Sequence, residues 1–234
     1  MTHKTFLFVD ADFDLFKSCF MEAGEWENCK FEVAPDKCSR EHLASLLSGE
    51  NVAAVIFMEG RTKHWEALKQ YYLGGGVVVF FGIIGEYQAP YHFSNRLGFI
   101  WRFSSYTRHE FELTAKAASL LGNSVTSQQY TKCNLISVPE EDRWMVPKAP
   151  TLEEFMDENV GYSDEAKADE DTLEEIREAR ERYPAYVEEL YNQCPLAVHQ
   201  ESNGGKFIYL GFVNGDGNIP KFVRGLLLGE MISG

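Results

Sequence analysis

Residues 74–85 read GGGVVVFFGIIG, an apolar run that begins after three glycines and ends in a glycine-rich turn. Five consecutive apolar residues, Val77 to Phe81, are typical of a strand buried on both faces of a sheet. A tight turn after such a strand is where many α/β enzymes place a nucleophile. The turn Gly82-Ile83-Ile84-Gly85 contains no Ser, Cys, Thr or Lys, so this stretch predicts a scaffold without predicting a reaction.

Similar short β-rich runs recur along the chain, separated by segments with helical spacing. This alternation is typical of βαβ units and predicts an α/β fold with a mostly parallel sheet. A length of 234 residues with 44% hydrophobic content fits a single domain over residues 1–234. The expected strands are Thr5 to Val9, Phe31 to Ala34, Val52 to Met58, Val77 to Phe81, Leu135 to Val138, Leu196 to His199 and Phe207 to Val213.

Two helices are expected between the early strands. Ser39 can cap a helix that places Leu43 and Leu47 on one face. Thr62 can cap a second helix that runs to Leu73, where the glycines end it. Each helix then connects two parallel strands on one side of the sheet.

The composition changes after Pro139. Between Thr151 and Gln193 the chain has 15 acidic and four basic residues, so this segment carries −11 of the total charge of −14. We therefore expect an acidic helical insertion at about residues 140–193. It is either a solvated excursion that packs by one face on the domain, or a surface for a basic protein partner.

Helix boundaries within this insertion have clear sequence signals. Thr151 to Glu154 and Thr172 to Glu175 match the S/T-x-x-E capping box that begins helices. Pro184 has no N–H to donate and clashes inside a helix, so we expect it to kink the helix or to begin a second one, giving two short helices.

The end of the chain predicts a hairpin and a helix. The apolar runs Leu196 to His199 and Phe207 to Phe212 flank a polar turn that contains Asn203-Gly204, which is typical of a β-hairpin. Pro220 then stands in the first turn of an amphipathic terminal helix.

Three segments together resemble the class I glutamine amidotransferase-like superfamily, most closely its ThuA-like (trehalose-utilisation) branch. They are Ala67 to Val79, reading ALKQYYLGGGVVV, Gly205 to Phe212, reading GKFIYLGF, and the closing helix. The resemblance covers about two thirds of the chain and implies a flavodoxin-like sheet with helices on both faces. Catalytic members have a cysteine in the turn after the glycine-preceded strand and a His-x-Glu after a late strand.

This chain departs from that catalytic pattern at both places. The turn after Phe81 has Gly82, Ile83 and Ile84 instead of a cysteine. His199-Gln200-Glu201 does read His-x-Glu, but it comes one strand before the last one. We therefore expect His199 to be a surface histidine of the hairpin, and the domain to lack amidotransferase chemistry.

Ligands of open α/β sheets bind at the carboxyl ends of the strands. There a cluster of carboxylates can bind a small polar substrate, with Glu59 or Glu86 as general base. The competing interpretation is that Asp10, Asp12 and Glu59 cap the helices that follow. The ligand-binding candidates are Asp10, Asp12, Glu59, Gly60, Arg61, Gly82, Glu86, Tyr87 and His92.

Metals and cofactors are not expected. A metal site would draw on Asp10, Asp12, Glu59 and His92, but their spacing matches no metal-binding motif. The aromatic run from Tyr91 to Tyr106 lines a ligand mouth, a dimer face or a partner groove, or else packs in the core.

Charge and cysteine content limit the partners. A net charge of −14 argues against nucleic-acid and anionic-membrane binding, both of which need clustered Lys and Arg. Five cysteines without a C-x-x-C pair indicate free thiols in a reducing compartment. Since no apolar run approaches the roughly 18 residues of a membrane span, we expect a cytoplasmic protein.

The sequence thus supports three hypotheses about function. The leading one is a catalytically silent, ThuA-like domain, a pseudoenzyme that works by binding, as a homo-oligomer or as part of a larger assembly. The alternative is an enzyme of the same fold that uses strand-end carboxylates. In the third, the acidic segment 151–193 docks a basic protein.

Overall fold

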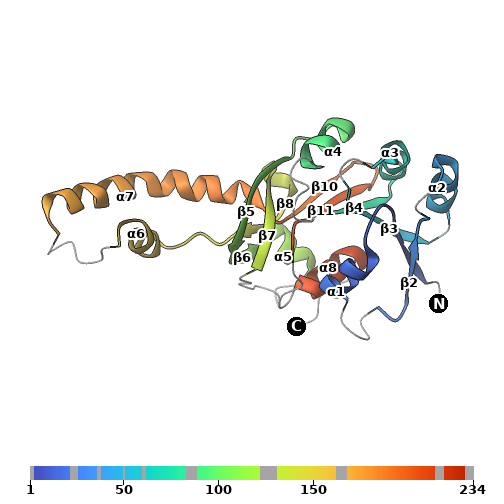
Figure 1. Ribbon diagram of the computed structural model, residues 1–234, viewed down its shortest axis with the longest axis horizontal. Coiled ribbons are helices and arrows are strands. Elements are labelled where there is room, and N and C mark those ends of the chain that lie inside the picture. Colours follow the sequence, from blue (N-terminus) through green and yellow to red (C-terminus); the bar gives the residue numbers. More distant parts are fainter. Residues whose placement is uncertain are drawn as a thin grey trace.

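The computed structural model describes most of the chain and has two sheets (Figure 1). An eight-stranded sheet lies at the centre with helices on both faces, and a three-stranded antiparallel sheet lies beside it. The expected α/β class is therefore confirmed. The described residues are 3–21, 26–35, 38–49, 51–59, 62–82, 89–121, 131–161, 168–213 and 219–229.

The large sheet is parallel in one half and antiparallel in the other. Neighbours from β2 to β11 run parallel, and the hairpin of β10 and β11 begins the antiparallel half. In spatial order its strands are β2 (Cys29–Val33), β1 (Lys4–Phe8), β3 (Val52–Phe57), β4 (Val77–Phe81), β11 (Lys206–Leu210), β10 (Leu196–Gln200), β8 (Arg143–Pro147) and β6 (Phe111–Leu113). The small sheet has the order β5 (Arg102–His109), β7 (Thr131–Ser137) and β9 (Gln193–Cys194).

Strands β3 and β4 form the centre of the core, as their continuous apolar runs predict. Side chains alternate between the two faces of the sheet, and both faces are buried. Ile56 and Phe81 face one apolar cluster, and Phe57 and Phe80 face the other. The first cluster is completed by α1 (Phe13–Phe20), α5 (Ala115–Leu121) and α8 (Ile219–Leu228), and the second by α2 (Arg40–Leu47), α3 (Trp65–Leu73) and α4 (Ala89–Leu97).

The two predicted helix caps have different outcomes. Ser39 caps α2 by accepting from the His42 N–H at 3.2 Å, as predicted. The prediction for Thr62 is wrong, because α3 begins at Trp65 with His64 at the N-cap position. The Thr62 hydroxyl instead donates to the Asp10 carboxylate and accepts from the His64 N–H at 3.2 Å.

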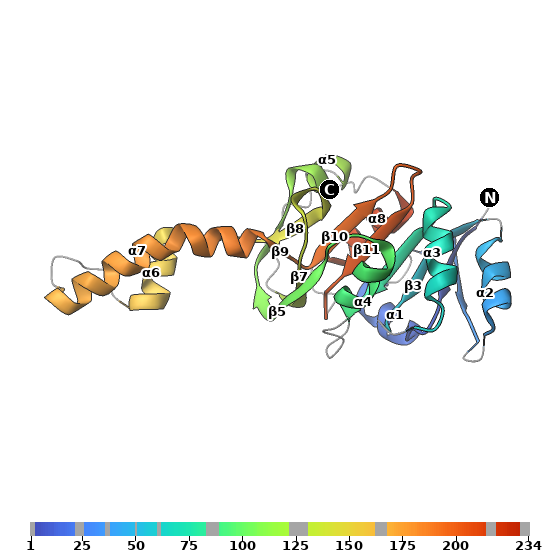
Figure 2. The same cartoon turned by 90° about the horizontal axis from the view of Figure 1, so that it is seen from above.

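Two helices project from the sheets as a separate arm in both views (Figures 1 and 2). They are α6 (Leu152–Val160) and α7 (Glu170–Tyr191), and we call these two helices the arm and the remaining elements the body. The capping box at Thr151 and Glu154 is present. The second capping box is wrong, because Asp169 caps α7 by accepting from the Thr172 N–H at 2.9 Å.

The prediction of two short helices around Pro184 is also wrong. Helix α7 is 22 residues long in total and continues through Pro184, which is exposed. It does so because Tyr183 and Tyr186, on either side of the proline, pack against Phe155 of α6 with ring centroids 5.4 Å and 4.8 Å away. Packing on a partner helix therefore outweighs the local effect of the proline.

Several strands were not expected from the sequence. Strands β5, β6, β8 and β9 were not predicted, because they are short or carry Arg, Ser and Thr between apolar residues. The aromatic run before β5 divides between two roles. Phe99 and Trp101 are buried in the core, while Tyr91 and Ile100 are exposed. Among the described helices, none is both long and apolar enough to span a membrane.

Candidate functional site

The carboxyl ends of β1 and β3 are joined by Asp10. Its backbone carbonyl accepts from the Met58 N–H at 3.3 Å, and its carboxylate accepts from the Thr62 hydroxyl. Asp10 has a φ of 47°, a left-handed conformation that Asp tolerates better than most residues. The Asp10 carboxylate thus holds the loop after β3 and does not cap a helix, which corrects the capping interpretation for this residue.

The other two carboxylates at this edge behave differently from each other. Asp12 caps α1, with its Oδ1 accepting from the Leu15 N–H at 2.9 Å, as the capping interpretation predicts. Glu59 does not cap, because its side chain is exposed and α3 begins only at Trp65. Of the three carboxylates, the structure therefore assigns a capping role to Asp12 alone.

The end of β4 is closely packed at Gly82. A β-carbon at this glycine would lie 3.1 Å from the Tyr209 hydroxyl, so a side chain there would require Tyr209 to shift. Tyr209 is buried and donates to the Asn134 carbonyl at 3.2 Å, and the Asn134 side-chain amide donates to the Gly82 carbonyl at 3.3 Å. Buried neighbours therefore occupy the space that a side chain at the first residue of the turn would need.

The remaining candidates at this edge are only partly described. His92 lies in α4 and is half-buried. Gly60, Arg61, Glu86 and Tyr87 lie outside the described residues, as do Ile83 and Ile84.

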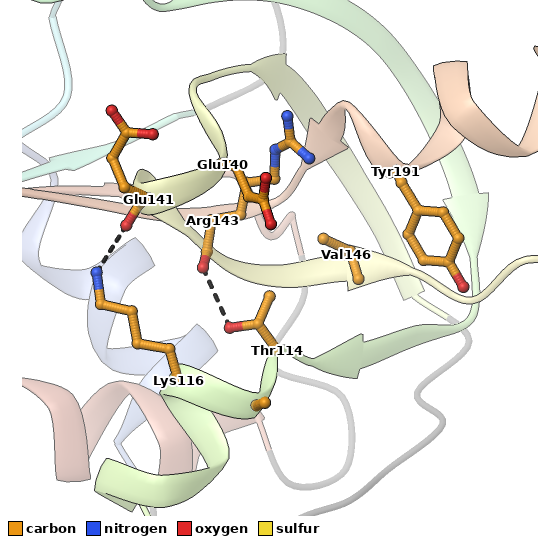
Figure 3. Close-up of a pocket in the computed structure, with 8 residues that line it drawn as sticks. Thr114, Lys116, Glu140, Glu141, Arg143, Val146 and Tyr191 are labelled. Carbon is orange, nitrogen blue, oxygen red and sulfur yellow. Dashed lines mark hydrogen bonds between the residues drawn. The ribbon is translucent and has the colours of Figure 1, made fainter.

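Two cavities lie elsewhere on the body and at the arm. The first, of about 800 Å³, is bounded by α5, η2 (Glu140–Asp142), β8 and the end of α7 (Figure 3). Its cations are engaged by the protein itself: Lys116 Nζ donates to the Glu141 carbonyl at 2.6 Å, and an Arg143 nitrogen donates to Asn192 Oδ1 at 2.7 Å. Neither this cavity nor the second, of about 510 Å³, is lined by any of the five ligand-binding candidates that the structure describes.

The second cavity marks the root of the arm. It lies between the loop after β5, the segment that leads into α6, and the two arm helices. Lys148 and Glu110 form an ion pair of 3.1 Å here, which raises the pKa of the Lys148 ammonium through the hydrogen bond to Glu110. The Tyr183 hydroxyl donates to the Pro150 carbonyl at 2.8 Å and ties α7 to the start of the arm.

The arm has a small apolar core of its own. Four buried residues, from both helices, form a cluster that is separate from the two clusters of the body. They are Phe155, Met156, Ile176 and Ala179.

The outer surface of α7 is acidic. Glu174, Glu181 and Glu188 are seven residues apart, so they lie on one face, and all three are exposed. Hydrogen bonds at the starts of the two arm helices favour the charged forms of Glu154 and Asp169. The backbone and hydroxyl of Thr151 lower the pKa of Glu154, and those of Thr172 lower the pKa of Asp169.

The structure also contains a polar network that the sequence did not predict. Asp142, a buried carboxylate in η2, binds His199 of β10 and Trp101. Its partners are 57 and 41 residues away in the chain, so no local pattern points to them. His199 is on the hairpin as expected, but it is partly buried and paired instead of being a simple surface residue.

No protein-family model and no curated protein matches this chain.

Proposed function

We propose that the protein is a catalytically silent, ThuA-like member of the glutamine amidotransferase-like superfamily that works by binding other proteins. In this proposal the body is the scaffold and the arm carries the binding surface. The observation that carries the proposal is the projection of the acidic arm from the body (Figures 1 and 2). The partner is a basic protein, alone or within a larger assembly.

The strand order supports the family part of this proposal. The parallel half of the sheet has the order β2-β1-β3-β4-β11. With β11 as the fifth parallel strand, this is the order of flavodoxin-like folds. The GKFIYLGF segment that carries part of the resemblance covers β11, beside the glycine-preceded strand β4.

The placement of His199 supports the absence of acyl-transfer chemistry. A nucleophile and its base must lie within hydrogen-bonding reach of each other. Gln200 pairs with Lys206, and Lys206 pairs with Val77, so the His-x-Glu sequence lies at the amino end of β4. The turn that begins at Gly82 follows the other end, about 16 Å away along the strand. A base at His199 is thus at the wrong end of the sheet.

The geometry of the arm supports a binding role. A helix of 22 residues is about 33 Å long, and most of α7 has only α6 to pack against. Its outer face therefore remains in solvent and presents carboxylates at regular spacing. Charge complementarity favours a partner with Lys and Arg at matching intervals, and long-range attraction would speed its association.

Binding of a designed helical peptide, with lysines seven residues apart, tests this proposal. The arm variant carries Glu174→Gln, Glu181→Gln and Glu188→Gln, which keep helix propensity while removing three charges. The matched control removes three exposed body charges with Asp14→Asn, Glu27→Gln and Glu112→Gln. Calorimetry at low salt should show at least about a tenfold loss of affinity for the arm variant, little change for the control, and weakening with added salt.

Two outcomes would contradict the proposal. If both triple variants lose affinity equally, the peptide responds to net charge and not to the arm. If affinity does not depend on salt, the interaction is not electrostatic.

A further inference from the structure

His199 lies between two carboxylates that come from different parts of the chain. On one side its Nδ1 is 2.9 Å from Asp142 Oδ2 and 3.0 Å from Oδ1. On the other side its Nε2 is 4.0 Å from Glu201 Oε1. Since an ionised carboxylate can only accept, the proton on Nδ1 belongs to the imidazole. The second nitrogen is therefore the one that gains or loses a proton.

The surroundings of the imidazole are otherwise aromatic and largely buried. The Phe99 ring lies 4.7 Å away, centroid to centroid, and the Trp101 ring lies 6.5 Å away. The Trp101 indole N–H donates to Asp142 at 2.8 Å, and the Tyr72 hydroxyl donates to Glu201 at 3.2 Å. Both carboxylates thus have a neutral donor, and His199 lies between them.

Protonation of His199 changes the charge and the hydrogen bonds that it offers to the two carboxylates. A buried carboxylate is unfavourable unless a donor or a positive charge compensates it. Neutral His199 donates one hydrogen bond to Asp142, whereas the imidazolium supplies a positive charge and directs a second donor toward Glu201. The groups that face it are Asp142 and Glu141 of η2, Glu201 after β10, and Tyr72 of α3.

The pKa values of these groups agree with the geometry. The hydrogen bond to Asp142 raises the pKa of His199, against the opposing effect of burial, and the charges of Glu201 and Glu141 raise it further. Burial and the neighbouring Glu201 raise the pKa of Tyr72, so its hydroxyl remains a neutral donor.

The network connects to the arm through the next residue. Arg143 follows Asp142 directly, and its guanidinium donates to Asn192 Oδ1 at 2.7 Å and to the Val138 carbonyl at 3.2 Å. Asn192 is the C-cap residue of α7. The turn that holds Asp142 therefore also holds the end of the arm helix.

We propose that the protonated His199 is a latch that fastens the β10–β11 turn to η2 and, through Arg143, steadies the root of the arm. Because the pKa of His199 is raised, the latch is closed below the ordinary histidine pKa of about 6.5. It opens as the pH rises through the higher value of the folded state. The latch stands without the proposed function, and only its effect on partner binding rests on it.

The test combines histidine NMR titration with amide hydrogen exchange. The wild type is compared with His199→Gln, and with His42→Gln, which removes an exposed histidine from α2. In the wild type, His199 should titrate above the ordinary histidine value of about 6.5. Protection of the amides of Asp142, Glu201 and Asn192, corrected for intrinsic exchange, should fall about five- to tenfold over the same pH range. His199→Gln should abolish that pH dependence, and His42→Gln should leave it unchanged.

Three results would overturn the latch. The first is a His199 pKa at or below the ordinary histidine value of about 6.5. The second is unchanged protection while His199 titrates, and the third is pH-dependent protection that persists in His199→Gln. Binding of the lysine peptide is measured at both ends of the titration. If the amides respond but binding does not, the latch holds and its link to the proposed function fails.

Discussion

In the body, β3 and β4 are buried on both faces between layers of helices, whereas in the arm two helices bury only a narrow strip between them. The body contains most of the apolar residues, and the segment with the arm carries most of the net charge. The body therefore supplies most of the packing that holds the fold together, and the arm contributes mainly exposed charge. Mutations should therefore affect the whole molecule in one region and a single element in the other.

The largest effect is expected at Phe57, which is fully buried and packs against Trp65, Phe80 and Phe207. Phe57→Ala leaves a cavity in the centre of the sheet and should lower the free energy of unfolding by about 3–5 kcal/mol. Urea denaturation followed by circular dichroism measures this. A loss below about 1 kcal/mol would mean that this face is not the core of the body.

A comparable truncation in the arm should remain local. Ile176 is buried only between the two arm helices, so Ile176→Ala should destabilise the arm by about 2–3 kcal/mol. Hydrogen exchange should accelerate across α7 while the amides of β3 and β4 keep their protection. Equal acceleration in both regions would show that the arm and the body unfold as one unit.

Pro184 provides a change in the opposite direction. Because a proline inside a helix removes a hydrogen bond and introduces a clash, Pro184→Ala should stabilise the arm by about 1–2 kcal/mol. Slower exchange along α7, with no change in the body, checks this. Faster exchange would mean that Pro184 itself is needed for the packing of α7 on α6.

The smallest expected effect is at the first helix of the arm. Thr151→Ala removes the hydroxyl that accepts from the Glu154 N–H, which is one half of the capping box, and should destabilise α6 by about 1 kcal/mol. The pKa of Glu154 is lowered mainly by the Thr151 backbone N–H and further by the Thr151 hydroxyl, so loss of the hydroxyl should raise it only part of the way toward its ordinary value. Carboxylate NMR titration measures the shift, and an unchanged pKa would argue against the contact between the Thr151 hydroxyl and the Glu154 carboxylate.

The body was largely predictable from sequence because its signals are local. Val52 to Phe57 and Val77 to Phe81 are continuous apolar runs, and Ser39 is a simple cap. Strand β5 was not predictable, because polar residues interrupt its sequence: its exposed side carries Arg102, Ser104 and Arg108 beside Tyr106. The cap at Thr62 was wrong because its hydroxyl donates to the carboxylate of Asp10, which follows β1 and lies 52 residues earlier in the chain.

The candidate sites show the same limit. The acidic segment is visible in composition alone, and the Thr151 cap fixes where its first helix begins. The single long helix was not predictable, because Tyr183 and Tyr186 hold it together only through contacts with α6. The pairing of His199 with Asp142 depends on the fold that brings η2 to the hairpin.

The central claim is that the arm, and not the strand ends of the body, is the binding surface. Hydrogen exchange of the wild-type protein, with and without the lysine peptide at low salt, tests it most directly. The claim predicts that the peptide slows exchange within Glu170–Tyr191. Slowed exchange confined to residues 10–12 and 57–59 and to Gly82, at the carboxyl ends of the parallel strands, would contradict it.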